Sequence, residues 1–272
     1  MAYASLDRPE ILSHIFYPRS EVFRTRGGSA EDLMIPVERY IHIGARVHGA
    51  DPSFPSILFF HGNGEIAADY DELGPLMNQC GANFVAVDYR GYGRSGGSPT
   101  VTTMMTDCHR IYDYLLKWLP QNGLTGPVIV MGRSLGSASA LELVASHPEE
   151  IPGLVTDSGF AYTLPLLQRL GVDVDRFHLD ESGTFGQIQK IAAFSNTVLV
   201  IHGEKDMIIP ISDGVALYDS CLSEDKTLLR IPEAGHNDIF SYGLTAYMAA
   251  IEEIAGKITE NSNNPGDHPD AS

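Results

Sequence analysis

The sequence contains no apolar stretch long enough to cross a membrane. A membrane-spanning helix needs ~18 or more consecutive apolar residues, and no segment approaches that length. The opening stretch, MAYASLDRPE, has no basic cluster and no apolar core of the kind that directs secretion. We therefore expect a cytoplasmic protein that has no stable association with membranes.

Cysteine is scarce. Cys80, Cys108 and Cys221 are the only cysteines among 272 residues, and they lie far apart in the sequence. Cys80 and Cys108 fall at positions that face the core of predicted helices, so we expect free, buried thiols in a reducing compartment. No spacing of cysteine and histidine is typical of a zinc site. The sequence therefore implies neither a metal ion nor a cofactor.

Positive charge is also in short supply. The 18 Lys and Arg residues stand against 35 Asp and Glu residues, which gives a formal net charge of -17 at pH 7. Such a surface repels nucleic acid and anionic membranes and favours solubility. A polyanionic substrate is disfavoured for the same reason. The sequence gives no indication of the oligomeric state.

Short apolar runs alternate with helical patterns along the chain. The runs of strand length lie at residues 57–60, 84–87, 128–130, 154–156, 198–201 and 227–231. Between them lie helical stripes, of which the one over residues 101–119 is the clearest. This alternation predicts an α/β fold, in which helices cover both faces of a mostly parallel sheet. The hydrophobic content of 43% suits one such domain, over residues 1–260.

Other segments depart from this alternation. Residues 32–47 alternate apolar and polar side chains, which predicts a β-hairpin formed by the first two strands. Residues 261–272 are polar and contain proline and glycine, so we expect a disordered tail there.

The segment MGRSLGS, at residues 131–137, directly follows one of the buried strands. It contains Gly132-x-Ser134-x-Gly136, the pattern of a nucleophile elbow, in which serine stands on a strained turn between a strand and a helix. The residues two before and two after this serine must be small, since a larger side chain would make the strand and the helix collide. The helix that follows would direct backbone N–H groups and a partial positive charge toward the serine. We therefore predict that Ser134 is a nucleophile.

A serine hydroxyl needs a base that takes its proton and a third group that orients the base. Asp206 follows the strand at 198–201, in the segment HGEKD, and His236 follows the last strand, in the segment EAGHND. The chain order Ser134, Asp206, His236 is the order found in one hydrolase fold and differs from that of the two best-known protease folds. Asp238 and Glu204 are neighbouring acidic alternatives.

Taken together, HGNGE at 61–65, VDYRGYGRSGG at 87–97, GRSLGS, IHGEKDMIIP and AGHND resemble the α/β-hydrolase superfamily. The likeness runs from about Pro18 to Ile258 and is strongest to the serine-hydrolase branch that includes the Bem46-like and ABHD13/17-like proteins. It implies an eight-stranded-type sheet and a triad in which Ser134 attacks the substrate. In this triad His236 is the base and Asp206 orients it. Some relatives take the acid from the position of Asp157, so this residue stays an alternative.

The tetrahedral intermediate of such a reaction carries a negative oxygen, which needs preorganised N–H donors. The backbone N–H of Leu135, the residue after the nucleophile, is one expected donor. The resemblance implies the N–H of Asn63 as the other. Gly64 would let this loop curl toward the substrate, whereas the resemblance makes His61 a residue that braces the loop.

The glycine-rich loop at residues 88–96 contains two arginines and so invites a phosphate-binding interpretation. It lacks the lysine pattern of a P-loop and the glycine spacing of a dinucleotide fingerprint. The resemblance implies a structural loop in which Arg90 forms an internal ion pair.

Residues 160–193 occupy the place where this fold inserts a lid. The segment is short, so it can wall an acyl pocket but cannot form a large cap domain, and Phe160 is a candidate for that wall. We therefore expect a carboxylesterase that acts on short to medium acyl chains of small-molecule esters. The alternatives are an acyl-protein or acyl-CoA thioesterase, an amidase or peptidase, and, more remotely, a non-catalytic binding protein.

Overall fold

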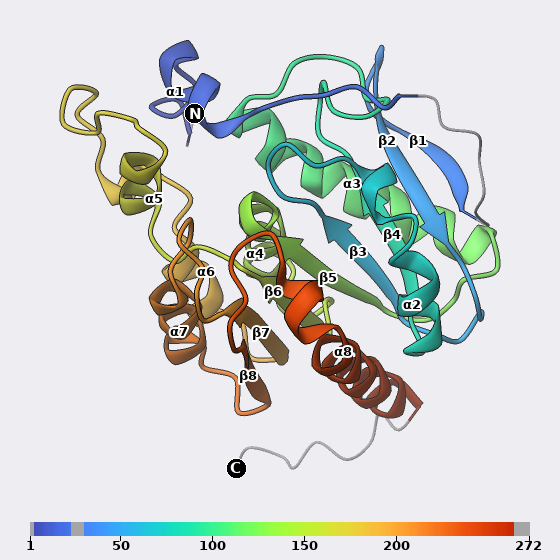
Figure 1. The fold of residues 1–272 in the computed structure, drawn as a ribbon. Helices are drawn as coiled ribbons and strands as arrows, with labels where there is room; N and C mark the ends of the chain where they lie inside the picture. The colour runs from blue at the N-terminus through green and yellow to red at the C-terminus, as the bar shows by residue number, and fades with distance from the viewer. Residues whose placement is uncertain (1–2, 23–29, 264–272) are drawn as a thin grey trace.

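The computed structural model describes residues 3–22 and 30–263. Its centre is one eight-stranded sheet in the order β1-β2-β4-β3-β5-β6-β7-β8 (Figure 1). The strands are Glu31–Glu38 (β1), Ile41–His48 (β2), Ser56–Phe60 (β3), Asn83–Val87 (β4), Val128–Arg133 (β5), Gly153–Asp157 (β6), Thr197–Gly203 (β7) and Lys226–Ile231 (β8). In this order, every neighbouring pair from β4 to β8 is parallel. The pairs β1–β2 and β2–β4 are antiparallel. This architecture confirms the predicted α/β-hydrolase fold.

Burial explains which strands were easy to recognise in the sequence. Every residue of β3 to β7 is buried, as expected for strands covered on both faces, so each of these strands contains a continuous apolar run. The edge strand β1 instead alternates exposed and buried residues over most of its length, since only one of its faces contacts the core. The antiparallel pairing of β1 with β2 confirms the hairpin predicted over residues 32–47.

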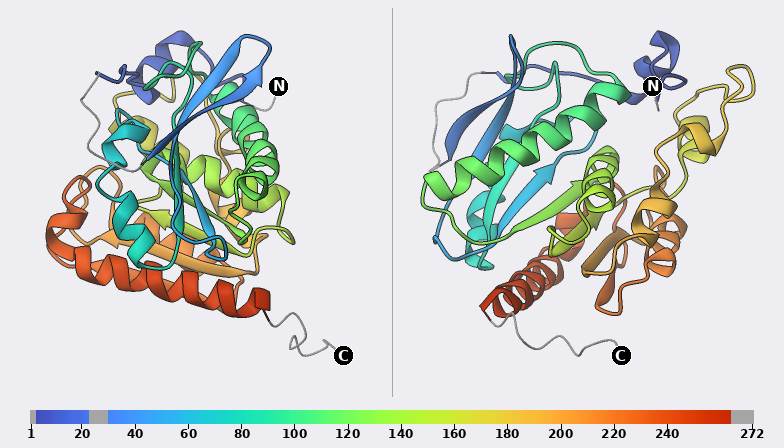
Figure 2. Two further views of the ribbon diagram at one scale, coloured as in Figure 1. Left: turned by 90° about the vertical axis from the view of Figure 1, so that its right-hand side faces the viewer. Right: turned by 180° about the vertical axis from the view of Figure 1, so that it is seen from behind.

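Helices cover both faces of the sheet. The α-helices are Pro9–Ile15 (α1), Gly74–Gln79 (α2), Val101–Gln121 (α3), Ser137–Ser146 (α4), Thr163–Arg169 (α5), Gln187–Ala192 (α6), Ile211–Ser220 (α7) and Ile239–Asn263 (α8). Three 3-10 turns are Ala67–Tyr70 (η1), Ser134–Gly136 (η2) and Glu181–Gly183 (η3). Helices α3 and α4 lie on one face, whereas α2 and α8 lie on the other (Figure 2). The sheet thus separates two hydrophobic cores, one on each face.

Helix α3 follows the predicted apolar stripe. Thr100 caps its N-terminus by accepting a hydrogen bond from the Thr103 backbone N–H. Its buried side includes Met104, Cys108, Ile111 and Leu115, which recur at the three- and four-residue spacing of one helix face. Cys108 and Cys80 are buried free thiols, as predicted, and Cys221 is one as well.

The segment at residues 160–193 leaves the sheet after β6 and returns before β7. It contains α5, η3 and α6, and the N-terminal segment packs against it: Ser5 Oγ donates to the Gly183 carbonyl, and His14 Nδ1 bonds the Leu170 carbonyl at 2.8 Å. The segment thus contains two short helices and one 3-10 turn, and its role as a lid stays a prediction.

The C-terminal boundary differs from the prediction. Helix α8 continues to Asn263, past residue 260, because Ile251, Ile254 and Ile258 extend its buried stripe almost to its end. The predicted disordered tail therefore does not begin at residue 261, and residues 264–272 lie outside the described part of the chain. No helix within residues 3–22 and 30–263 is long and apolar enough to cross a membrane.

Candidate active site

Ser134 stands on the turn between β5 and α4, at the carboxyl edge of the sheet. Its φ angle of 50° lies in the left-handed region, which costs a non-glycine residue about 1–2 kcal/mol. A Cβ on Gly132 would collide with the backbone of Gly136, and a Cβ on Gly136 would collide with the carbonyl of Phe60. Both flanking positions therefore require glycine, which is the steric reason that the sequence pattern implied.

Two hydrogen bonds join Ser134 to His236 and His236 to Asp206. His236 Nδ1 donates to Asp206 Oδ2 at 2.6 Å, because an ionised carboxylate can only accept. That tautomer leaves Nε2 as an acceptor for the Ser134 hydroxyl, 2.9 Å away. The structure thus brings together the three residues predicted for the triad, although 102 positions separate Ser134 from His236.

The second oxygen of Asp206 holds its own loop in shape. Asp206 Oδ1 accepts from the backbone N–H groups of Ile208, at 2.9 Å, and Ile209, at 2.8 Å. Burial alone would raise the pKa of Asp206, but the hydrogen bond and charge of His236 and the Ile209 N–H outweigh burial and hold this pKa below its usual value. The carboxylate therefore stays ionised and able to orient the imidazole.

His202, near the end of β7, also holds the loop that contains Asp206. This role was not predicted from the sequence. His202 Nε2 bonds the Ile209 carbonyl at 2.8 Å, and the fully buried ring lies against Gly214 of α7, where a Cβ would collide with it. The sequence carried a signal for this role, since a histidine at the end of an all-apolar strand has to find a polar partner inside the fold.

The loop after β3 borders the nucleophile turn. Gly64 has a φ angle of 76°, which glycine adopts without strain, and its carbonyl accepts from Arg19 Nε at 2.7 Å. The side-chain oxygen of Asn63 accepts from the Tyr17 N–H and the Tyr92 hydroxyl, each at 2.8 Å. These contacts fix the loop whose Asn63 N–H is a candidate oxyanion donor.

Leu135 is the middle residue of η2, so its N–H belongs to the first turn of a helix, where backbone donors have no intrahelical acceptor. The close approach of Gly136 to Phe60 brings this turn against the end of β3. The candidate donors Leu135 and Asn63 therefore come from adjoining segments. His61 is fully buried and its Nδ1 bonds the Gly62 carbonyl at 2.7 Å, a position that suits a bracing role.

The alternative acids lie elsewhere. Asp157 is fully buried and bonds the hydroxyls of Ser158 and Tyr247. Asp238 Oδ1 accepts from the Gly235 N–H within the loop between β8 and α8 that carries His236, here called the histidine loop. Glu204 pairs with Arg230 at the surface. In the described part of the chain, none of these three carboxylates forms a hydrogen bond or ion pair with the His236 ring, whereas Asp206 does.

Phe160 is fully buried, and its ring packs edge-on against Phe185, with 5.4 Å between the ring centroids. It thus joins the start of the lid segment to its later part. Its proposed place in the wall of an acyl pocket stays a prediction.

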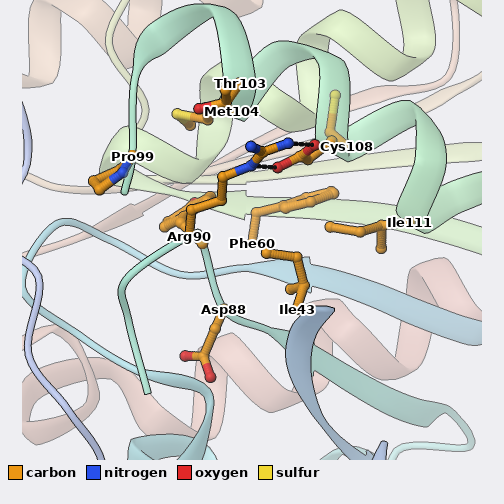
Figure 3. Close-up of a pocket in the computed structure, with 11 residues that line it drawn as sticks. Ile43, Phe60, Asp88, Arg90, Pro99, Thr103, Met104, Cys108 and Ile111 are labelled. Carbon is orange, nitrogen blue, oxygen red and sulfur yellow. Dashed lines mark hydrogen bonds and ion pairs between the residues drawn. The ribbon is translucent and has the colours of Figure 1, made fainter. Parts of the chain in front are cut away.

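A separate cavity lies between α3 and the loop after β4, and none of the candidate triad residues lines it (Figure 3). Arg90 crosses this cavity and forms an ion pair with Asp107, with Arg90 Nε 2.6 Å from Asp107 Oδ2, and a second one with Glu38. The two carboxylates account for the charge of Arg90, as expected from the resemblance, and a phosphate is not needed to explain it.

Arg133 and Glu65 are further residues at the site that the sequence did not single out. Arg133 is buried, its Nε lies 3.0 Å from Glu65 Oε1, and its Nη2 donates to the His236 carbonyl at 2.8 Å. Both lie inside motifs identified in the sequence, Glu65 in HGNGE and Arg133 in GRSLGS. The missed signal was therefore a charged side chain within a motif that follows or ends a buried strand. Among the described residues, no group of three or more His, Cys, Asp or Glu side chains is arranged to hold a metal ion.

The geometry has a clear chemical capacity. A hydroxyl on a strained turn donates to an imidazole, which is bonded to a buried carboxylate. Candidate N–H donors lie on the same turn, at Leu135, and on the loop after β3, at Asn63. That arrangement is suited to attack on a carbonyl carbon followed by proton transfer to the leaving group.

Comparison with known families gives a match to the sequence family described as "Serine aminopeptidase, S33" over residues 52–169. The chain is 29% identical over 191 residues to the protein Bem46 of Schizosaccharomyces pombe, which covers 68% of this chain and 62% of Bem46. It is 30% identical over 211 residues to human alpha/beta hydrolase domain-containing protein 17B, which covers 74% of this chain and 66% of the human protein. The matched part therefore spans less than two thirds of the length of either relative.

Solved structures show the same fold. An esterase from Pyrococcus furiosus superimposes with a TM-score of 0.70 at 18% identity, covering 89% of this chain and 99% of the esterase. Est1E from Butyrivibrio proteoclasticus, solved with bound ferulic acid, superimposes with a TM-score of 0.68 at 19% identity, covering 84% of this chain and 99% of Est1E. At these identities the likeness establishes the architecture and not the substrate.

Proposed function

Because this chain is an α/β-hydrolase of the serine-hydrolase type, related to Bem46 and to alpha/beta hydrolase domain-containing protein 17B, we propose that it cleaves carboxylic esters through an acyl-enzyme. The observation that carries the proposal is the pair of hydrogen bonds from Ser134 Oγ to His236 Nε2, at 2.9 Å, and from His236 Nδ1 to Asp206 Oδ2, at 2.6 Å. These distances allow proton transfer without rearrangement of the three residues.

In the proposed reaction Ser134 Oγ attacks the ester carbonyl carbon while its proton passes to His236 Nε2. The carbonyl oxygen becomes an oxyanion, which the N–H groups of Leu135 and Asn63 would stabilise. Collapse of this intermediate breaks the bond to the leaving alcohol, which takes the proton from His236. Water then attacks the acyl-enzyme, with His236 as base again, and releases the acid and free Ser134.

Asp206 would stabilise the imidazolium that forms in both steps. Because its pKa is held below the usual value, Asp206 remains ionised when His236 becomes positively charged. One carboxylate oxygen faces the imidazole while the other is held by two backbone N–H groups, so the pair stays oriented throughout the cycle.

The small size of the lid segment favours short to medium acyl chains as substrates. Only α5, η3 and α6 lie between Phe160 and β7, which leaves little apolar surface to enclose a long chain. We propose small-molecule acyl esters as the substrates. The predicted cytoplasmic location and the lack of stable membrane association stay predictions.

Hydrolysis of a p-nitrophenyl ester series, from acetate to palmitate, by the wild type and Ser134→Ala tests this proposal. We expect turnover that peaks at short to medium chains. It should fall by at least ~10³-fold in Ser134→Ala because the nucleophile is lost, while the fold is retained because only one oxygen is removed. A parallel series of acyl-CoA thioesters and p-nitroanilides tests the other leaving groups. Substantial turnover by Ser134→Ala would refute the mechanism, and activity on thioesters or anilides alone would refute the ester substrate.

A further inference from the structure

Arg133 is covalently joined to Ser134 and is 5% exposed, although it carries a full charge. A buried guanidinium is tolerated only where carboxylates and carbonyls surround it. Burial lowers the pKa of Arg133, but the charges of Asp157 and Glu65 outweigh burial and raise this pKa above its ordinary value, so Arg133 is always charged. Its three nitrogens point to three different segments.

The first of these segments is the candidate oxyanion loop. Arg133 Nε donates to Glu65 Oε1 at 3.0 Å. The other oxygen of Glu65 accepts from the Gly62 N–H at 2.6 Å and from the Tyr70 hydroxyl at 2.5 Å. Glu65 therefore ties the backbone of the loop that contains Asn63 to the guanidinium of Arg133.

The second segment is the histidine loop between β8 and α8. Arg133 Nη2 donates to the carbonyl of His236 itself at 2.8 Å. Loops are the most mobile part of a fold, and the imidazole moves with the backbone that carries it. A bond to this carbonyl therefore restricts the distance between His236 Nε2 and Ser134 Oγ.

The third segment is the end of β6. Asp157 stands opposite Arg133 in the register of β5 and β6, and its Oδ1 lies 3.6 Å from Arg133 Nη1. Asp157 is in turn bonded by the Tyr247 hydroxyl of α8 at 3.1 Å. The charge of Arg133 is thus paired with a carboxylate of β6, and a hydroxyl from α8 holds that carboxylate in place.

We propose that Arg133 is a positioning residue that fixes the histidine loop and the candidate oxyanion loop relative to the nucleophile Ser134. It belongs to the same peptide stretch as Ser134, bonds the backbone of His236 directly, and reaches the oxyanion loop through Glu65. The inference rests on the proposed function, since it assigns Arg133 to that reaction. Lysine cannot replace it, because one ammonium nitrogen cannot occupy the separate positions of Nε and Nη2.

The test compares Arg133→Lys with Arg90→Lys, using p-nitrophenyl butyrate as substrate. Both arginines are buried and each pairs with two carboxylates. The partners of Arg90 are Asp107 and Glu38, and Arg90 lines a cavity to which no candidate triad residue contributes. We expect Arg133→Lys to lower kcat about 10- to 100-fold with KM changed less than about threefold, because misplaced groups slow chemistry more than binding. We expect Arg90→Lys to lower the melting temperature about as much as Arg133→Lys does, but to lower kcat by less than about twofold.

Glu65→Gln is the second variant and keeps the proposal testable if Arg133→Lys folds poorly. Glutamine has one acceptor oxygen for the donors that Glu65 serves, so kcat should fall about three- to tenfold. In the double variant the two losses should not multiply, since both act through one network. Unchanged kcat in a folded Arg133→Lys protein, an equal loss in Arg90→Lys, or fully multiplicative losses would each overturn the proposal.

Fluorophosphonate labelling of Ser134 separates this proposal from the proposed function. Labelling requires the nucleophile, the base and the oxyanion site but no particular substrate. If the wild type is labelled yet cleaves no ester, the ester proposal fails, and a labelling rate lowered about 10-fold in Arg133→Lys and unchanged in Arg90→Lys still supports the role of Arg133. An equal labelling rate in all three proteins would overturn that role, and a wild type that is not labelled would overturn both.

Discussion

Asp157 and Asp206 lie at the carboxyl ends of neighbouring strands of the same sheet, yet their carboxylates have different partners. Asp206 lies in the loop after β7 and bonds His236 Nδ1 at 2.6 Å. Asp157 is the last residue of β6 and stands opposite Arg133 in the register of the sheet. Both are buried carboxylates at the carboxyl edge, where either could in principle have oriented the base.

The difference comes from backbone position. A carboxylate within a strand meets the side chain opposite it in the next strand, and for Asp157 that neighbour is Arg133. Asp206 stands beyond the end of its strand, where the loop turns and its N–H groups at Ile208 and Ile209 hold the carboxylate toward the histidine loop. We infer that Asp157 supports the site at one remove, through Arg133, whereas Asp206 acts on the base directly.

The sharpest way to break this comparison is Asp206→Asn. The amide N–H₂ would face His236 Nδ1 and favour the tautomer that cannot accept the proton of Ser134. We expect kcat/KM for p-nitrophenyl butyrate to fall about 10³- to 10⁴-fold while the fold is retained. Steady-state kinetics with circular dichroism as the folding control measures this. A loss of less than tenfold would show that Asp206 does not orient the base.

Asp157→Asn should have a smaller effect of a different kind. Asparagine can still form hydrogen bonds with the Tyr247 and Ser158 hydroxyls, but it removes the negative charge that balances Arg133. We expect the free energy of unfolding to fall by about 1–3 kcal/mol and kcat by less than about tenfold. Urea unfolding and kinetics on the same preparation measure both. A kcat loss as large as that of Asp206→Asn would erase the distinction between the two acids.

The fold was predictable because burial on both faces of β3 to β7 leaves apolar runs that need no tertiary information to recognise. The turn at Ser134 was predictable too, because sterics at Gly132 and Gly136 fix the spelling of the sequence. The start of the disordered tail was misplaced, since the polar composition after residue 260 does not reveal that α8 continues to Asn263.

The supporting network could not be predicted. Arg133 bonds Glu65, 68 positions away, and the carbonyl of His236, 103 positions away, and no sequence pattern specifies which loops meet across a sheet. Asp206 was predicted as the acid from the sequence, with Asp157 kept as an alternative, because the sequence does not show which carboxylate reaches His236. Only the register of β5 with β6 places Arg133 opposite Asp157 and so separates the two roles.

The smallest expected effect is on acid stability, and it sharpens the comparison from the side of Asp206. A carboxylate whose pKa is lowered by folding stabilises the protein above its unfolded value, about 3.9, and that contribution is lost as the pH falls through the folded value. The difference in free energy of unfolding between the wild type and Asp206→Asn should therefore be larger at about pH 5.5 than at about pH 3. Urea unfolding at the two pH values measures it, and the other carboxylates cancel because both proteins contain them. A difference that is constant or grows toward pH 3 would mean that His236 and the Ile209 N–H do not hold this carboxylate in its ionised form.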